Sequence, residues 1–116
     1  MADDTYKAIH KYARISASKA RLVADLIRGE PVEAALNKLR FCQRRAAPML
    51  RKVLLSAAAN ATQKDGLDAE ELFVWKTYVD EGPTMKRWRP RAMGRAYPRL
   101  RRSCHLTIEL RKAEQS

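Results

Sequence analysis

Glycine and cysteine are scarce in this sequence of 116 residues, and each scarcity excludes a class of site. The 4 glycines form neither a GxxxxGK[ST] loop nor a GxGxxG turn, so the usual cradle for nucleotide phosphates is missing. Cys42 and Cys104 lie far apart without a CxxC pair, which argues against a disulfide framework and suits a reducing compartment. With His10 and His105 they still lack the paired spacing of a zinc site, so we expect no bound metal.

Catalytic groupings are also missing. No serine, histidine and acid stand in a recognisable nucleophile context. The acids Asp65, Asp68, Glu70 and Glu71 cluster loosely, but they fit a solvated loop and a helix cap better than a metal site. The sequence therefore predicts a protein that is not an enzyme and needs no cofactor.

No apolar run approaches the roughly 20 residues that would span a bilayer, because charged residues interrupt the longest candidates. The start Met1-Ala2-Asp3-Asp4 is acidic and lacks the basic flank and apolar core of a secretory signal. We expect no membrane insertion and a cytoplasmic location.

Acidic residues are few compared with basic ones. Lys and Arg number 24 against 13 Asp and Glu, which gives a net charge of +11 and a pI near 10.2. Fifteen of the basic residues are arginine, whose planar, bidentate donors suit phosphates and base edges. This balance favours a nucleic-acid partner over an anionic membrane. The length predicts a single domain over residues 1–116.

One segment carries the strongest signal, because residues 86–102 contain no acid and eight basic residues: Lys86, Arg87, Arg89, Arg91, Arg95, Arg99, Arg101 and Arg102. Trp88 and Tyr97 lie among them. Basic side chains neutralise phosphates, and aromatic rings and guanidinium planes stack on unpaired bases. The segment predicts binding to RNA; the alternative is a solvated, disordered basic loop.

The first half of the chain predicts a strand and three helices. Thr5 to Arg14 alternates weakly and reads as a short strand. Ser16 or Ser18 then caps a helix that ends at Gly29. Its expected core face is Leu22, Val23, Leu26 and Ile27, with Lys19 and Arg21 directed towards solvent or a ligand.

Two further helices follow. Pro31 begins one that ends near Phe41, with Val32, Ala35, Leu36 and Leu39 as its core face. The next should run from about Gln43 to Gln63 and stop at Asp65-Gly66. Pro48 is tolerable there within the first turn and otherwise predicts a kink. The alanines at 57, 58, 59 and 61 permit close packing, or simply favour the helix.

The second half changes to a period of two. Residues 72–80 place Leu72, Val74, Lys76 and Tyr78 on one side, and residues 104–110 alternate as a half-buried antiparallel strand. The basic segment between them is then an extended hairpin over about residues 82–103, reaching roughly 35 Å from the body. The predicted fold class is α+β: a strand, three helices, then two antiparallel strands that form a long protruding hairpin, in two layers.

Several motifs resemble the large-subunit ribosomal protein L-twenty-two family. Residues 79–97 read VDEGPTMKRWRPRAMGRAY, and residues 103–108 read SCHLTI. RIS at 14–16, KARLVADLIRG at 19–29, KVL at 52–54 and ANA at 59–61 agree as well. Nearly the whole chain is covered in order. Departures are Ala17-Ser18 in place of Pro-Arg, Met93 at a usually polar or basic position, and Pro98-Arg99 in place of a basic and an aliphatic residue; they leave the tip contacts and the arm register open.

The resemblance implies a structural constituent of the large ribosomal subunit. Its partners would be large-subunit (23S-type) rRNA, neighbouring ribosomal proteins, the nascent peptide in the exit tunnel, and macrolide antibiotics near the hairpin tip. The tunnel-lining tip would be Arg89, Pro90, Arg91, Ala92, Met93, Gly94 and Arg95. The RNA-binding residues would be Arg14, Ser16, Lys19, Arg21, Lys86, Arg87, Trp88, Arg89, Arg91, Arg95, Tyr97, Arg99, Arg101, Arg102 and His105.

A rival interpretation is an architectural DNA-binding protein that lays a basic β-ribbon in a groove. Composition alone does not separate the two. The interleaved Trp88 and Tyr97 favour unstacked RNA bases, and a basic chain without an evident dimer interface suits burial in RNA better than paired half-sites.

Overall fold

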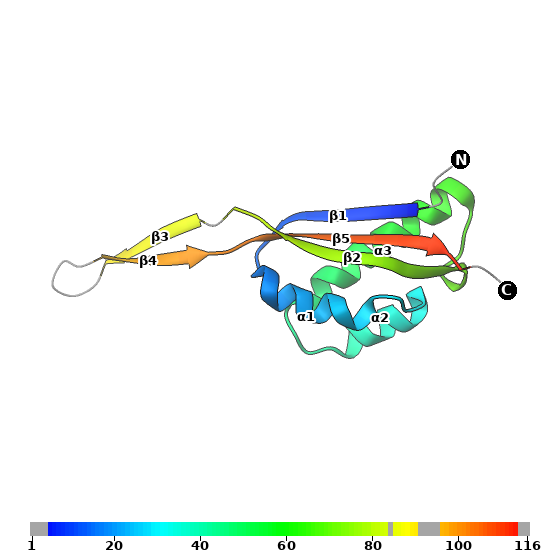
Figure 1. Ribbon diagram of the computed structural model, residues 1–116, viewed down its shortest axis with the longest axis horizontal. Coiled ribbons are helices and arrows are strands. Elements are labelled where there is room, and N and C mark those ends of the chain that lie inside the picture. The colour runs from blue at the N-terminus through cyan, green and yellow to red at the C-terminus, as the bar shows by residue number, and fades with distance from the viewer. Residues whose placement is uncertain (1–4, 84, 91–95, 114–116) are drawn as a thin grey trace.

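The computed structural model describes residues 5–83, 85–90 and 96–113, with the side chains of residues 5–83 and 102–113. The chain forms a helical and sheet body from which a two-stranded ribbon projects (Figure 1). Its long axis measures 68 Å against 31 and 20 Å for the other two. The elements are β1 (Thr5–Ala13), α1 (Ala17–Ile27), α2 (Val32–Phe41), α3 (Ala46–Asp65), a short 3-10 helix (Ala69–Glu71), β2 (Leu72–Glu81), β3 (Met85–Pro90), β4 (Ala96–Arg101) and β5 (Cys104–Lys112).

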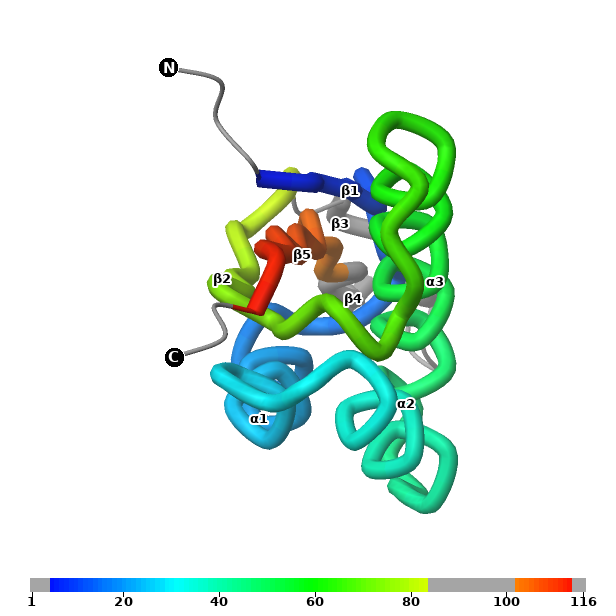
Figure 2. The backbone as a smooth tube through the Cα atoms, turned by 90° about the vertical axis from the view of Figure 1, so that its right-hand side faces the viewer, coloured from blue at the N-terminus to red at the C-terminus, as the bar shows by residue number. Residues whose placement is uncertain are grey.

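The body is an α+β structure in two layers, as the sequence predicts. Its antiparallel sheet has the strand order β1-β5-β2, so the last strand of the chain lies between β1 and β2. The three helices cover one face, with α3 along one side and α1 and α2 together below (Figure 2). Leu106, Ile108 and Leu110 of the central strand are fully buried beneath them. The other sheet face keeps Lys7 and Lys11 exposed.

Helix α1 confirms half of its predicted core face, because Val23 and Ile27 are buried as predicted. Leu22 and Leu26 are 53% and 47% exposed, so their assignment to the core was wrong. The buried positions are Ala17, Ala20, Val23, Ala24 and Ile27. Their spacing follows the helical period as well as the leucines do, and the small alanines let the helix lie close to the sheet, which turns the larger leucines outward.

Helix α2 confirms its predicted face, and helix α3 confirms its predicted C-terminal end. Val32, Ala35 and Leu39 are buried and Leu36 is partly buried. Helix α3 begins at Ala46 and not at Gln43, which places Pro48 in its first turn, where a missing N–H breaks no helical hydrogen bond. It ends as predicted at Gly66, whose φ of 66° is left-handed; the Gly66 N–H donates to the Thr62 carbonyl and the Leu67 N–H to the Ala61 carbonyl.

Strand β2 departs from its predicted alternation. A bulge between Val74 and Lys76 leaves Trp75 as an extra residue against Leu110 and Glu109 of β5. The buried positions are Leu72, Val74, Thr77 and Val79, so the side that was predicted to hold Lys76 and Tyr78 with Leu72 changes at the bulge. Regular alternation cannot reveal a bulge, because one extra residue reverses every side chain that follows.

The bulge also organises the outer sheet face. The Arg111 guanidinium carbon lies 3.3 Å from the Trp75 ring centroid, and the Lys76 ammonium lies 4.3 Å from the same centroid. Cations that contact the face of an indole ring are attracted by its negative quadrupole. The Trp75 ring thus contacts two cations of the chain itself.

The hairpin is present as predicted, as the separate two-stranded sheet β3-β4. Its ladder runs from Met85 opposite Arg101 to Pro90 opposite Ala96. Pro90 and Pro98 both stand within this ladder, in strands whose outer edges pair with nothing among the described residues.

Candidate nucleic-acid interface

The base of the hairpin is fixed by Gly82 and Ser103. The Gly82 N–H donates to the Ser103 carbonyl over 3.0 Å, and the Ser103 hydroxyl donates to the Pro83 carbonyl over 2.7 Å. A Cβ at position 82 would lie 2.6 Å from Ser103 Oγ and 3.3 Å from the Ser103 carbonyl carbon. The absence of a side chain at Gly82 is therefore what lets the two arms approach.

Replacing Gly82 by alanine is expected to lower the free energy of unfolding by about 1 kcal/mol, because Ser103 must turn away and lose its hydrogen bond. Chemical denaturation of the two proteins measures this cost. In a double-mutant cycle the Ser103→Ala background should reduce the cost of Gly82→Ala, since it removes the oxygen that the new methyl meets. Strict additivity would show that the clash does not occur.

The register sorts the basic residues of the ribbon by face. Opposed positions in an antiparallel ladder share a face, and successive positions alternate between faces. Positions 87 and 89 of β3 therefore share one face with 97, 99 and 101 of β4. That face carries Arg87, Arg89, Arg99, Arg101 and Tyr97, whereas Lys86, Trp88 and Leu100 belong to the other. We call the first set of four arginines the arginine face.

Like charges oppose each other on the arginine face. Arg87 stands directly opposite Arg99. Like charges in opposed positions destabilise an isolated ladder, and a two-stranded ribbon has little stability of its own in water. An anion bound across this face would remove the repulsion.

The predicted residues of the body gather where the hairpin leaves it. Arg14 directly follows β1, Lys19 lies in the first turns of α1, and Arg102 precedes β5; all three are exposed. Figure 1 shows α1 beginning at the end of the body from which the hairpin projects. Segments far apart in the sequence thus extend the basic surface of the ribbon onto the body.

Arg21 is exposed, as the sequence predicts, but it also makes a contact within the body. Its guanidinium donates to the Val79 carbonyl over 3.0 Å, and Arg28 donates to the Thr77 carbonyl over 2.8 Å. Both carbonyls belong to β2, an edge of the sheet. Arg28 also pairs with Asp25 at 2.6 Å. The two arginines fasten α1 to the edge strand, so Arg21 has a structural contact besides any contact with RNA.

Ser16 is less available than predicted. It occupies the N-cap position of α1 without a side-chain cap hydrogen bond, and its hydroxyl oxygen is shielded from solvent without a partner among the described residues.

Cys104 lies in the core. Burial raises the pKa of the Cys104 thiol above its usual value, and the charge of Arg21 opposes this shift. The thiol therefore stays protonated at neutral pH and is a packing group.

His105 contacts Tyr12 of the neighbouring strand β1. Its Nδ1 accepts a hydrogen bond from the Tyr12 N–H over 3.0 Å, and the two rings meet edge to face with centroids 4.9 Å apart. Tyr12 adopts a left-handed φ of 59°, which is unusual for a residue other than glycine, and is 62% exposed. The pattern of β1 did not reveal this exposed aromatic residue, because it lies at the irregularity between His10 and Ala13.

The groups considered for metal binding have other placements. Cys104 is buried in the core and its neighbour His105 faces the opposite side of β5. Asp68 and Glu71 form a capping box at the 3-10 helix, with the Asp68 N–H donating to Glu71 over 3.0 Å. The loose acidic cluster is thus a helix cap, as predicted.

Residues 91–95 lie outside the described part of the chain. Of the predicted tip, the structure describes only the strand positions of Arg89 and Pro90. The predictions for Arg91, Ala92, Met93, Gly94 and Arg95 fall on residues that it does not describe. Among the described residues, none of the helices has the length and apolarity needed to cross a bilayer.

Comparison with protein families decides the identity. The family model described as Ribosomal protein L22p/L17e matches residues 8–111, which is nearly the whole chain. The chain belongs to this family. It is therefore a structural protein of the large ribosomal subunit, and the family is not enzymatic. The match includes all five strands of the body and hairpin and the three helices, so the resemblance in the motifs extends over the fold.

Proposed function

We propose that the protein binds large-subunit rRNA and holds separate rRNA segments in place as the subunit assembles. The observation that carries the proposal is the arginine face of a ribbon that extends the molecule to 68 Å. Four arginines on one face can neutralise phosphates of a neighbouring strand and release its counterions. The exposed Arg14, Lys19 and Arg102 at the base supply further phosphate contacts.

The hairpin tip, residues 89–95, is proposed to line the nascent-peptide exit tunnel. Membership of the family supports this role, and so does a two-stranded ribbon, β3 and β4, that projects from the body. Nascent peptide and tunnel-bound macrolides would then be neighbours of Arg91 and Arg95. The remaining partners would be adjacent ribosomal proteins, in a cytoplasmic ribosome.

The architectural DNA-binding function remains the second candidate, because a basic two-stranded ribbon also fits a DNA groove. A ribbon that enters a groove reads base edges, usually as part of a symmetric dimer with spaced half-sites. The family match favours the ribosome, since its members are constituents of the large subunit.

Ultraviolet crosslinking in cells, with sequencing of the attached nucleic acid and mapping of the crosslinked residues, tests the proposal. We expect most crosslinks in large-subunit rRNA, through Trp88, Tyr97 and their neighbours, because aromatic rings that stack on bases crosslink efficiently. Crosslinks from residues 89–95 to nascent polypeptide would support the tunnel role. Crosslinks concentrated on chromosomal DNA would overturn the ribosomal proposal in favour of the DNA-binding one.

A further inference from the structure

A second segment of the chain is free of acidic residues. Residues 34–63 contain Lys38, Arg40, Arg44, Arg45, Arg51 and Lys52 and no Asp or Glu. Lys38 pairs with Glu30 at 2.8 Å. Within residues 5–83 and 102–113, no acid pairs with Arg40, Arg44 or Arg45. Three arginines around the turn between α2 and α3 therefore keep their charge available for an anionic partner.

A phenyl ring lies beside one of these arginines, Arg40, and precedes the other two in the chain. Phe41, the last residue of α2, is 78% exposed, although Leu39 in the same helix is buried. The Arg40 guanidinium carbon lies 5.7 Å from the ring centroid, at the outer limit of a cation–π contact. An exposed ring gives up the stabilisation that burial provides, so this one is available to a binding partner. We call Arg40, Phe41, Arg44 and Arg45 the α2–α3 corner.

The corner is held by buried residues on both sides. Cys42 packs against the core directly after Phe41, and Ala46 and Ala47 are buried at the start of α3. The Ala47 N–H donates to the Arg44 carbonyl over 3.1 Å. The backbone of the turn is therefore anchored to the core before and after the exposed residues.

The free protein bears an electrostatic cost at the corner. Arg44 and Arg45 directly precede α3, whose first turn contains no acid and whose N-cap residue, Arg45, makes no side-chain hydrogen bond. Positive charge beside the positive end of a helix dipole is unfavourable. A phosphate bound by the two arginines would offset this repulsion.

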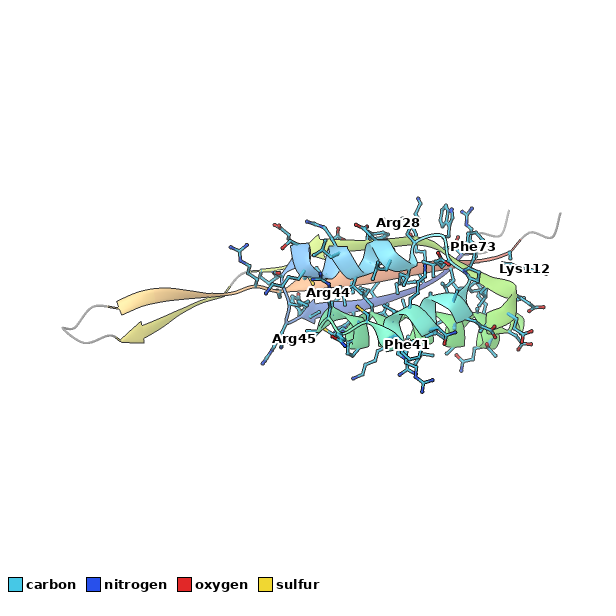
Figure 3. The ribbon with its side chains drawn as sticks, turned by 90° about the horizontal axis from the view of Figure 1, so that it is seen from below. Arg28, Phe41, Arg44, Arg45, Phe73 and Lys112 are labelled. Carbon is cyan, nitrogen blue, oxygen red and sulfur yellow. The ribbon has the colours of Figure 1, made fainter. Side chains whose placement is uncertain are left out.

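The corner is separate from the hairpin. In Figure 3, Arg44 and Arg45 lie on the side of the body towards the ribbon, Phe41 lies farther along the helical layer, and Lys112 marks the opposite end. Because the ribbon projects away from the body, Phe41 and the arginine face lie on different parts of the molecule.

We propose that the α2–α3 corner is a second RNA-binding surface, which stacks an unpaired base on Phe41 and holds the flanking phosphates with Arg40, Arg44 and Arg45. The inference rests on the proposed RNA-binding function and adds the class of RNA: a single-stranded segment, since a base inside a duplex cannot stack on a side chain. An acidic protein surface would satisfy the arginines but would give the exposed ring no flat partner.

The test measures the affinity of full-length protein for a fluorescent single-stranded RNA of about 12 nucleotides and for a duplex of the same sequence. All variants carry R87Q, R89Q, R99Q and R101Q, so that the ribbon contributes little. Phe41→Ala should weaken single-strand binding about 5- to 100-fold and leave duplex binding nearly unchanged. Phe41→Trp should retain single-strand binding, because an indole ring also stacks on bases.

The charge arm uses R40Q/R44Q/R45Q, which should reduce the slope of log affinity against log salt by about 2 for single strands. The matched control K7Q/K64Q/K112Q removes the same charge from exposed residues elsewhere on the body and should change the slope far less. Circular dichroism verifies that each variant folds, as expected for exposed residues.

Wild-type single-strand affinity in Phe41→Ala, or an equal loss of duplex affinity, would overturn the corner proposal. A third outcome would also overturn it: R40Q/R44Q/R45Q loses a crosslink between the corner and a neighbouring protein but keeps its affinity for RNA. The surface would then bind protein. These outcomes are distinct from failure of the ribosomal proposal, which depends on where the crosslinks of the wild-type protein map in cells.

Discussion

Replacing Leu54 by alanine is expected to lower the free energy of unfolding by about 2–5 kcal/mol. Leu54 is fully buried in α3, the longest helix, and belongs to the single core cluster between the helices and the sheet. Truncation removes three side-chain carbons, Cγ and the two methyl groups on it, and leaves a cavity whose walls lose their contacts. Against a total stability of about 5–15 kcal/mol for a small domain, this loss leaves little reserve. Urea denaturation of the isolated protein, followed by circular dichroism, measures it.

The neighbouring Leu55 supplies the control. It lies on the same helix and is 43% exposed. Leu55→Ala removes the same atoms as Leu54→Ala and changes helix propensity by the same amount. Its cost should stay below about 1 kcal/mol, since surface substitutions seldom exceed that. Equal losses in the two variants would mean that α3 is not packed on the sheet in the arrangement described.

Neutralising the arginine face is expected to have the largest effect on RNA binding. The variant R87Q/R89Q/R99Q/R101Q removes four charges, and each phosphate contact that is lost lowers the salt slope by about 0.7–0.9. The slope of log affinity for large-subunit rRNA against log salt should fall by about 3. If affinity is unchanged at about 1 M salt, binding near physiological salt should weaken by about two to three orders of magnitude. Filter binding across a salt series measures both.

The control for this variant removes equal charge from the body, with K7Q, K52Q, K64Q and K112Q in one protein. All four lysines are exposed. If general attraction between a basic protein and RNA dominated, both variants would lose slope equally, and a dedicated binding face would be refuted. Thermal unfolding should separate the functions as well: the ribbon variant should keep the melting temperature of the body, because its four positions belong to the two-stranded sheet β3-β4 and not to the sheet of the body.

The two predictions separate the region that stabilises the fold from the regions that carry the positive charge. Stability resides in the body, where the helices bury one face of a three-stranded sheet. Charge resides on the ribbon, at its base and at the α2–α3 corner, and no acid pairs with the corner arginines within the described side chains. The proposed RNA partner would therefore contribute stability where the isolated chain has repulsion.

Sequence alone determined the order of elements and the nature of the partner. Hydrophobic period separates helix from strand, as in the buried Val32, Ala35 and Leu39 of α2 and the alternating β5. Helix ends depend on local chemistry, so Gly66 and Pro48 fixed the limits of α3 to within a few residues. Charge is a property of composition, which is why the acid-free segment indicated a polyanion before any fold was known.

Tertiary structure decided what depends on packing between distant segments. Leu22 and Leu26 had the composition of a core face, but the sheet accepted the alanine stripe of α1 because small residues allow the closer approach. The bulge at Trp75 reversed the faces of β2, and no period in the chain announces an added residue. Arg21 meets the Val79 carbonyl only because α1 lies along the edge strand. The α2–α3 corner likewise became visible only when Phe41 proved exposed beside Arg40, since exposure is a property of the fold and not of the residue type.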